Sequence, residues 1–152
     1  MNGWRLADKD DVMEVCSDLR PEDIEEGRAM YGVNAATTLP LAFDPKRTWV
    51  LLTAEGESVA LAGLGPTSLP DVGQIWMVST PKLFTNRVRF LRRTQAFLSH
   101  MHEYHDVLWN YVDARQTAHL KWLKANGFEA VAYRPTWGVA GIPFYEMIRI
   151  NN

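Results

Sequence analysis

Apolar and polar positions follow two periods along this chain, and each change of period marks the boundary of a predicted element. Segments with strand character are short, apolar and rich in β-branched or aromatic side chains. They are residues 1–7, 48–54, 58–64, 73–79, 107–114 and 128–133. Glu55, Gly56 and Glu57 form a tight connection between two of them, which predicts a β-hairpin over residues 48–64.

The helical period appears in four further segments. They are residues 10–16, 21–31, 81–104 and 117–126. Asp8 can cap the first helix, Pro21 can begin the second, and Asn126-Gly127 can stop the last. Residues 33–46 contain Pro40, Pro45 and small polar side chains, so we predict an irregular connection there.

The longest helical pattern, residues 81–104, has one broad apolar face. It consists of Phe84, Val88, Leu91, Leu98 and Met101, widened by Leu83, Phe90, Phe97 and Tyr104. This width predicts a helix that packs against a sheet. Arg89, Arg92 and Arg93 lie largely off the face. The simpler interpretation of these arginines is a solvated flank, and the alternative is a docking surface for an acidic protein or nucleic acid.

Composition narrows the class of protein. The 152 residues are 47% apolar and 22% charged, as in an ordinary globular protein, and we expect a single domain over residues 1–152. The formal net charge of −2 gives no general reason to expect nucleic acid or an anionic membrane as partner. The single Cys16 excludes an internal disulfide and a cysteine-rich zinc site. No signal-peptide pattern and no long apolar run is present, so we expect an intracellular protein that spans no membrane.

Two polar clusters have both a structural and a functional interpretation. Glu22, Asp23, Glu25 and Glu26 follow Pro21, and we favour a solvated first helical turn over an acidic cleft for an amine substrate. Three histidines end the long helical pattern, at positions 100, 102 and 105. They lack a convincing set of ligands, so we predict a polar helix end and no metal site.

Residues 107–133 resemble the C-terminal half of the Gcn5-related N-acetyltransferase (GNAT) fold. A buried strand is followed by a short helix, by Gly127-Phe128 and by another strand, and the family's helix carries a pattern like N-x-x-A-x-x-L-Y-x-x-x-G-F. The preceding helices, hairpin and strand follow the family's order. The resemblance implies an α+β, GNAT-like fold: a central mixed, mostly antiparallel sheet of six or seven strands flanked by about four helices.

The glycine loop of active GNATs is missing. In those enzymes a stretch like Q/R-x-x-G-x-G/A precedes the long helix, and its backbone N–H groups bind the coenzyme A pyrophosphate. Residues 79–87 contain no glycine, and Pro81, Leu83 and Phe84 remove a donor and add bulk. Lys82 and Arg87 supply charge, but charge does not replace backbone amides.

The family's general acid is missing as well. Aligning Gly127-Phe128 with the family's G-F places Gln116 at the usual Asn, His119 at the small Ala and Leu123 at the Tyr that often protonates the departing thiolate. Leucine cannot donate a proton. The alignment therefore predicts that the chain keeps the GNAT fold but lacks the residues that active GNATs use for catalysis.

A narrower resemblance rests on about 20 residues. Leu108-Trp-Asn-Tyr-Val112, Thr117-Ala-His-Leu-Lys-Trp-Leu-Lys124 and Gly127 are similar to the acyltransferase-like internal virion protein of T7-type short-tailed phages. There, L-W-N-Y-V precedes T-S-H-I-x-F-L-K and a glycine. The resemblance implies a phage-encoded protein of virion assembly or the internal core, present in the host cytoplasm during infection or in the virion.

Two functions follow from these observations. The first is a catalytically silent protein that contacts phage virion or core proteins through Arg87, Arg89, Arg92 and Arg93, with no cofactor. The second is an active acetyl-CoA-dependent N-acetyltransferase for a host protein or small amine. In that case Trp76, Met77, Val78, Asn110 and Tyr111 would bind the cofactor, and Tyr133, His119 or a water would handle the proton. We favour the first; its oligomeric state stays open.

Overall fold

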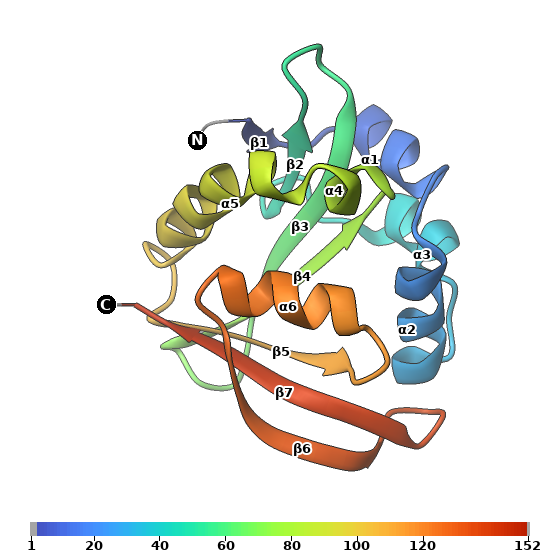
Figure 1. Ribbon diagram of the computed structural model, residues 1–152, viewed down its shortest axis with the longest axis vertical. Coiled ribbons are helices and arrows are strands. Elements are labelled where there is room, and N and C mark those ends of the chain that lie inside the picture. The colour runs from blue at the N-terminus through green and yellow to red at the C-terminus, as the bar shows by residue number, and fades with distance from the viewer. Residues whose placement is uncertain (1–2, 152) are drawn as a thin grey trace.

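The computed structural model describes residues 3–151, so positions 1 and 2 of the first predicted strand lie outside the described residues. Seven strands form one sheet in the order β1-β2-β3-β4-β5-β7-β6 (Figure 1). They are β1 (Trp4–Leu6), β2 (Thr48–Leu52), β3 (Ser58–Pro66), β4 (Val72–Ser79), β5 (Val107–Asp113), β6 (Glu129–Trp137) and β7 (Ile142–Ile150). The predicted mixed, mostly antiparallel sheet of six or seven strands is confirmed.

The centre of the sheet is opened by the one parallel pair among the described strands, β4 and β5. Their pairing covers only Val72–Gln74 against Val107–Trp109. From Ile75 and Asn110 onward the two strands have no registered pairs with each other. β3 and β7 continue to pair on the outer sides. The two strands therefore leave an opening between them in the middle of the sheet.

Six helices are present in the described chain. They are α1 (Lys9–Cys16), α2 (Pro21–Tyr31), α3 (Ala35–Ala42), α4 (Lys82–Thr85), α5 (Arg87–Met101) and α6 (Thr117–Ala125). None of them is long and apolar enough to cross a membrane.

The helices form two layers, one on each face of the sheet (Figure 1). On β2, the buried Val50 belongs to a cluster with Val12 of α1, whereas its neighbour Trp49 belongs to a cluster with Phe97 of α5. Successive side chains of a strand point to opposite faces, so α1 and α5 lie on opposite faces. Ile24 of α2 and Leu39 of α3 join the α1 cluster, whereas Leu83 of α4 and Leu123 of α6 join the α5 cluster.

The long helical pattern is interrupted at Asn86, which separates α4 from α5. The face of α5 that meets the sheet is formed by Phe90, Thr94, Phe97, Leu98 and Met101. Two aromatic side chains hold this face: the Phe97 ring stacks on Trp4 at 4.2 Å and meets the edge of Trp49 at 5.7 Å between centroids. The prediction that Val88 lies on the buried face is wrong. Its side chain is 81% exposed, because the buried stripe runs through Phe90 and Thr94.

The prediction of an irregular connection over residues 33–46 is also wrong. Helix α3 forms there, and the Asn34 side chain caps it by accepting a hydrogen bond from the Ala36 backbone N–H at 3.0 Å. Pro40 lies inside the helix. Leu39, Ala35 and Ala36 pack against the α1 cluster, and this tertiary packing stabilises a short segment whose sequence indicates a loop.

Candidate functional site

A cavity of about 300 Å³ occupies the opening between β4 and β5. Its walls come from both layers of helices, with Met30 and Leu39 on one side of the sheet and Leu98 and Leu123 on the other. The cavity therefore extends to both sides of the sheet, and most of its lining side chains are apolar.

All five residues predicted to bind a cofactor meet in this cavity. Its lining includes Trp76, Met77, Val78, Asn110, Tyr111 and His119. Tyr133 is not among the lining residues. It lies on the outermost strand β6, is 53% exposed and packs against Tyr145 with 5.2 Å between ring centroids. The structure thus brings together the predicted cofactor residues and His119, and leaves Tyr133 apart from them.

Two carboxylates from α2 line the same cavity, Asp23 and Glu26. Their i, i+3 spacing puts them on one side of the helix, whereas Glu22 and Glu25 are exposed on another. Burial raises the pKa of Asp23 to about 6, although Arg20 opposes the shift, and burial beside Asp23 raises the pKa of Glu26 to about 8. The predicted solvated turn is therefore correct for Glu22 and Glu25 and wrong for Asp23 and Glu26, which face an acidic cavity.

Asp23 also ties α2 to the end of β4. Its Oδ2 atom accepts a hydrogen bond from the Ser79 backbone N–H at 2.9 Å, and the Ser79 carbonyl accepts from the Arg20 backbone N–H at 2.9 Å. Gln116 at the start of α6 donates to Asp23 and Glu26. The strand end that follows the predicted cofactor residues therefore has both of its backbone groups bonded within the protein.

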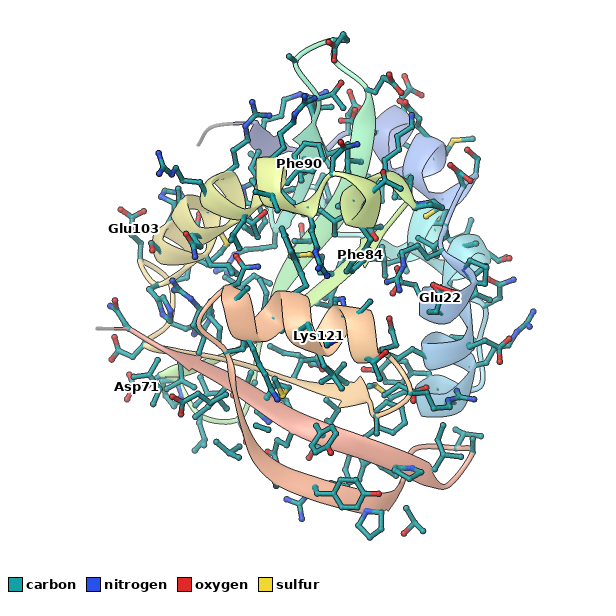
Figure 2. The ribbon with its side chains drawn as sticks, viewed as in Figure 1. Glu22, Asp71, Phe84, Phe90, Glu103 and Lys121 are labelled. Carbon is teal, nitrogen blue, oxygen red and sulfur yellow. The ribbon has the colours of Figure 1, made fainter. Side chains whose placement is uncertain are left out.

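Arg20 and Phe84 fill the space between α2, α4 and α6. The Arg20 guanidinium carbon lies 4.2 Å from the centre of the Phe84 ring, and its Nη1 donates to Gln116 Oε1 at 3.2 Å. The same ring lies 6.4 Å from His119 and 6.3 Å from Trp122 between centroids. Figure 2 shows Phe84 in this position between α4 and α6.

The His119 side chain is buried in the cavity wall, and its imidazole has no hydrogen bond to another described residue. Burial and the nearby Arg20 charge lower its pKa to about 3. The imidazole is therefore neutral at neutral pH, and it is a poor proton donor for a departing thiolate.

Three consecutive amides of the segment before α5 are used within the protein. The N–H groups of Leu83, Phe84 and Thr85 donate to the carbonyls of Thr80 and Pro81, forming the turn of α4. The Leu83 side chain is fully buried. A phosphate cradle needs N–H groups that point outward and are unoccupied. Here a helical turn uses them.

At the position where the family has its general acid, the Leu123 side chain is buried in the α5 cluster together with Phe128. The neighbouring Trp122 is also buried, and its indole N–H has no partner within the described chain. Neither side chain offers a titratable proton at the cavity.

The predicted contact arginines divide into two groups. Arg87, Arg89 and Arg92 are exposed on α5, and none of them forms an ion pair with another described residue. Arg93 is half-buried, with its side chain packed over the backbone of Gly3. We define the basic patch as Arg87, Arg89 and Arg92 together with the exposed Val88 between them.

The histidines at the end of α5 bond to backbone carbonyls. His102 Nδ1 lies 3.0 Å from the His105 carbonyl oxygen, and His105 Nδ1 lies 3.1 Å from that of Pro70. Among residues 3–151 no group of three His, Cys, Asp or Glu side chains is arranged to hold a metal ion.

Comparison with protein families finds a match over residues 50–132, which is more than half of the chain, to the family described as "Bacteriophage T7, probable scaffold protein Gp13". A comparison with curated proteins finds none that matches.

Solved structures with the same fold include GNAT acetyltransferases. An acetyltransferase of the GNAT family from Bacillus anthracis is 12% identical, with 97% of this chain and 93% of that chain covered and a TM-score of 0.75. A Gcn5-related N-acetyltransferase from Kribbella flavida is 19% identical, with coverage of 97% and 96% and a TM-score of 0.69. The enzyme AAC(6')-Ib, in complex with ribostamycin and coenzyme A, is 12% identical, with coverage of 97% and 92% and a TM-score of 0.71. The chain therefore has the GNAT fold.

Proposed function

The chain belongs to the phage protein family described as "Bacteriophage T7, probable scaffold protein Gp13", and from this premise we propose that it is a catalytically silent GNAT-like protein that acts in virion or core assembly. It acts through contacts with other phage proteins, in the host cytoplasm during infection or in the particle. The observation that carries the proposal is the closed turn of α4, whose amides bond to Thr80 and Pro81.

We call the region around the end of β4 and the α4 turn the coenzyme side, because active GNATs bind coenzyme A there. Three features of this chain close it to a coenzyme. The α4 turn uses the amides of Leu83 to Thr85, Phe84 fills the space beside His119 and Trp122, and Ser79 at the end of β4 is bonded to Arg20 and Asp23. An acyl-CoA would have to displace a partly buried aromatic side chain and break several backbone hydrogen bonds. Each of these changes costs on the order of 1 kcal/mol or more.

One observation favours the second function, an acetyl-CoA-dependent N-acetyltransferase. Asp23 and Glu26 place carboxylates in a cavity beside β4, and Glu26, with its pKa raised to about 8, has the properties of a general base for an amine. Acyl transfer also needs a bound thioester and an acid for the leaving thiolate. The closed coenzyme side and Leu123 supply neither, so we favour the silent protein.

The contact surface that we propose is the basic patch. Its three arginines are exposed and unpaired within the described residues, and Val88 at their centre is 81% exposed. Arginine combined with exposed apolar area is typical of protein interfaces. Arg93 contributes less, because its side chain packs over Gly3.

Calorimetric titration tests catalytic silence. Purified protein is titrated with coenzyme A and with acetyl-CoA, with an active GNAT enzyme as positive control, and an amine panel is assayed for acetylation. We expect no measurable heat of binding and no acetylated product. Binding at about micromolar Kd, equivalent to roughly 8 kcal/mol, would contradict the proposal.

Co-purification from infected cells tests the contact surface. The variant Arg89→Glu with Arg92→Glu reverses the centre of the basic patch, and the matched control Lys9→Glu with Lys46→Glu reverses two exposed lysines elsewhere. We expect the first variant to lose its virion or core partners and the control to keep them. Both should fold, because an exposed substitution usually costs less than about 0.5 kcal/mol. Equal recovery of partners with both variants would rule out the basic patch.

A further inference from the structure

Charge is separated across the sheet. Helices α1 and α2, on one face, contain seven acidic and two basic residues, an excess of five negative charges. Helices α4, α5 and α6, on the other face, contain seven Lys or Arg residues and no acidic residue. The net charge of −2 hides this division. Figure 1 shows α5 and α2 at opposite sides of the molecule.

Each face presents charges that are free to meet a partner. On α1 and its C-terminal end, Asp10 and Asp18 are exposed and form no ion pair with another described residue. Met13, between them, is 52% exposed. We define these three residues and the exposed Glu14 as the acidic patch. In both patches an exposed apolar side chain is surrounded by charges of one sign. These charges are negative in the acidic patch and positive in the basic patch.

The start of α5 is electrostatically unfavourable by itself. Arg87 and Arg89 stand in its first turn, no acidic residue accompanies them, and no side chain caps the helix. A cation at a helix N-terminus opposes the helix dipole and costs about 0.3–1 kcal/mol. By contrast, α1 has Asp10 and Asp11 in its first turn and a complete capping box from Asp8. Residues that lower local stability are typical of functional surfaces.

We propose that the basic patch of one molecule binds the acidic patch of a second copy of this chain. The inference rests on the proposed function, in which the basic patch is a contact surface, and names one partner for it. Because the two patches lie on opposite faces of the sheet, the contact is head-to-tail and leaves one free patch at each end. Such heterologous contacts continue to add copies, and they give rings or filaments.

Charge complementarity favours a second copy over a polyanion such as nucleic acid. A polyanion that approached α5 would also meet the field of the acidic layer, and the whole chain is negative. A second copy offers aspartates and an exposed Met13 to the arginines and Val88. It is also present wherever the protein is made.

Sedimentation velocity of the purified full-length chain tests the inference. We expect the sedimentation coefficient to rise with concentration beyond that of a dimer. Raising NaCl from about 0.05 M to about 0.5 M shortens the screening length from about 14 Å to about 4 Å and should weaken association by about tenfold or more. A chain that stays monomeric, or that stops at a dimer, overturns the head-to-tail contact.

Charge reversal on each patch gives the sharper test. The variant Arg89→Glu with Arg92→Glu leaves both patches negatively charged, and Asp10→Lys with Asp18→Lys leaves both patches positively charged; each variant alone should sediment as a monomer. Mixed in equal amounts they should associate again, whereas Lys46→Glu with Lys121→Glu, two exposed lysines outside both patches, should behave like the original chain. Circular dichroism and the melting temperature confirm that each variant is folded. If the mixture stays monomeric, the inference is wrong.

The outcomes separate this inference from the proposed function. A monomeric chain that still needs Arg89 and Arg92 to recover phage proteins from infected cells overturns self-association and leaves the proposed function standing. Association of the purified chain without any recovery of phage proteins supports the head-to-tail contact and contradicts the wider role.

Discussion

The guanidinium of Arg20 lies over the ring of Phe84, with 4.2 Å between its central carbon and the ring centroid. These residues come from helices on opposite faces of the sheet, one from the N-cap of α2 and the other from α4. Arg20 also bonds to Gln116 and Asp23, so the stacked pair joins the starts of α2 and α6 to α4.

Replacing Phe84 by Ala tests the proposal that this ring and the α4 turn prevent coenzyme A from binding. We expect a loss of about 1–3 kcal/mol in the free energy of unfolding, less than for a fully buried Phe, because the ring is only partly buried. Coenzyme binding should not appear, since the amides of Leu83 to Thr85 stay within the α4 turn. Denaturant unfolding and calorimetry measure both effects, with Val88→Ala as an exposed control. Acetyl-CoA binding by the variant would show that the ring alone excluded it.

Leu123→Ala removes a buried side chain from α6. The residue is 7% exposed and packs in the α5 cluster, so we expect a loss of about 2–5 kcal/mol from the cavity that remains. The exposed Lys121→Ala on the same helix should change stability by less than about 0.5 kcal/mol. Urea unfolding compares the two. Equal midpoints would mean that Leu123 is not a core residue and that its alignment with the family's Tyr is in error.

Gly63 and Gly65 on β3 form a matched pair. A Cβ atom on Gly63 would lie 2.1–2.2 Å from the Trp76 indole, whereas one on Gly65 would meet no heavy atom within 4 Å. Gly63→Ala must push Trp76 out of place, and we expect it to cost about 1–3 kcal/mol and to change the near-ultraviolet dichroism. Gly65→Ala should leave both nearly unchanged. Similar melting temperatures for the two variants would contradict this packing.

Glu26→Gln should change how stability depends on pH. The pKa of Glu26 is raised from 4.5 to about 8 in the folded protein, so the folded state holds a proton that the unfolded state has lost. Stability from this group is fully present below about pH 4.5 and is lost as pH rises to about 8. The variant should therefore decline less over this range and be the more stable protein above pH 8. Parallel pH profiles would show that the carboxylate is solvated.

The sequence by itself determined the main elements. Strands around residues 48–79 and 107–113 could be predicted because short apolar β-branched runs bounded by turn residues have few other stable forms. It also shows that residues 79–87 contain no glycine, and together with Pro81 and Leu83 this predicts that the segment does not form the phosphate loop of active GNATs. The stop at Gly127, whose φ is 90°, followed from a backbone conformation that favours glycine.

Only the tertiary structure decided which side of each helix is buried. In α2 the four acidic residues look alike in sequence, yet Asp23 and Glu26 face the cavity and Glu22 and Glu25 face solvent. In α5 the stripe through Phe90 and Thr94 is buried, and Val88 is exposed.

The physical reason is that periodicity states which residues share a face, whereas contacts with distant segments set the rotation of the helix about its axis. Such contacts join Trp4 to Phe97, Asp23 to Ser79 and Arg20 to Phe84. They link residues far apart in the chain, and local sequence preferences do not specify them.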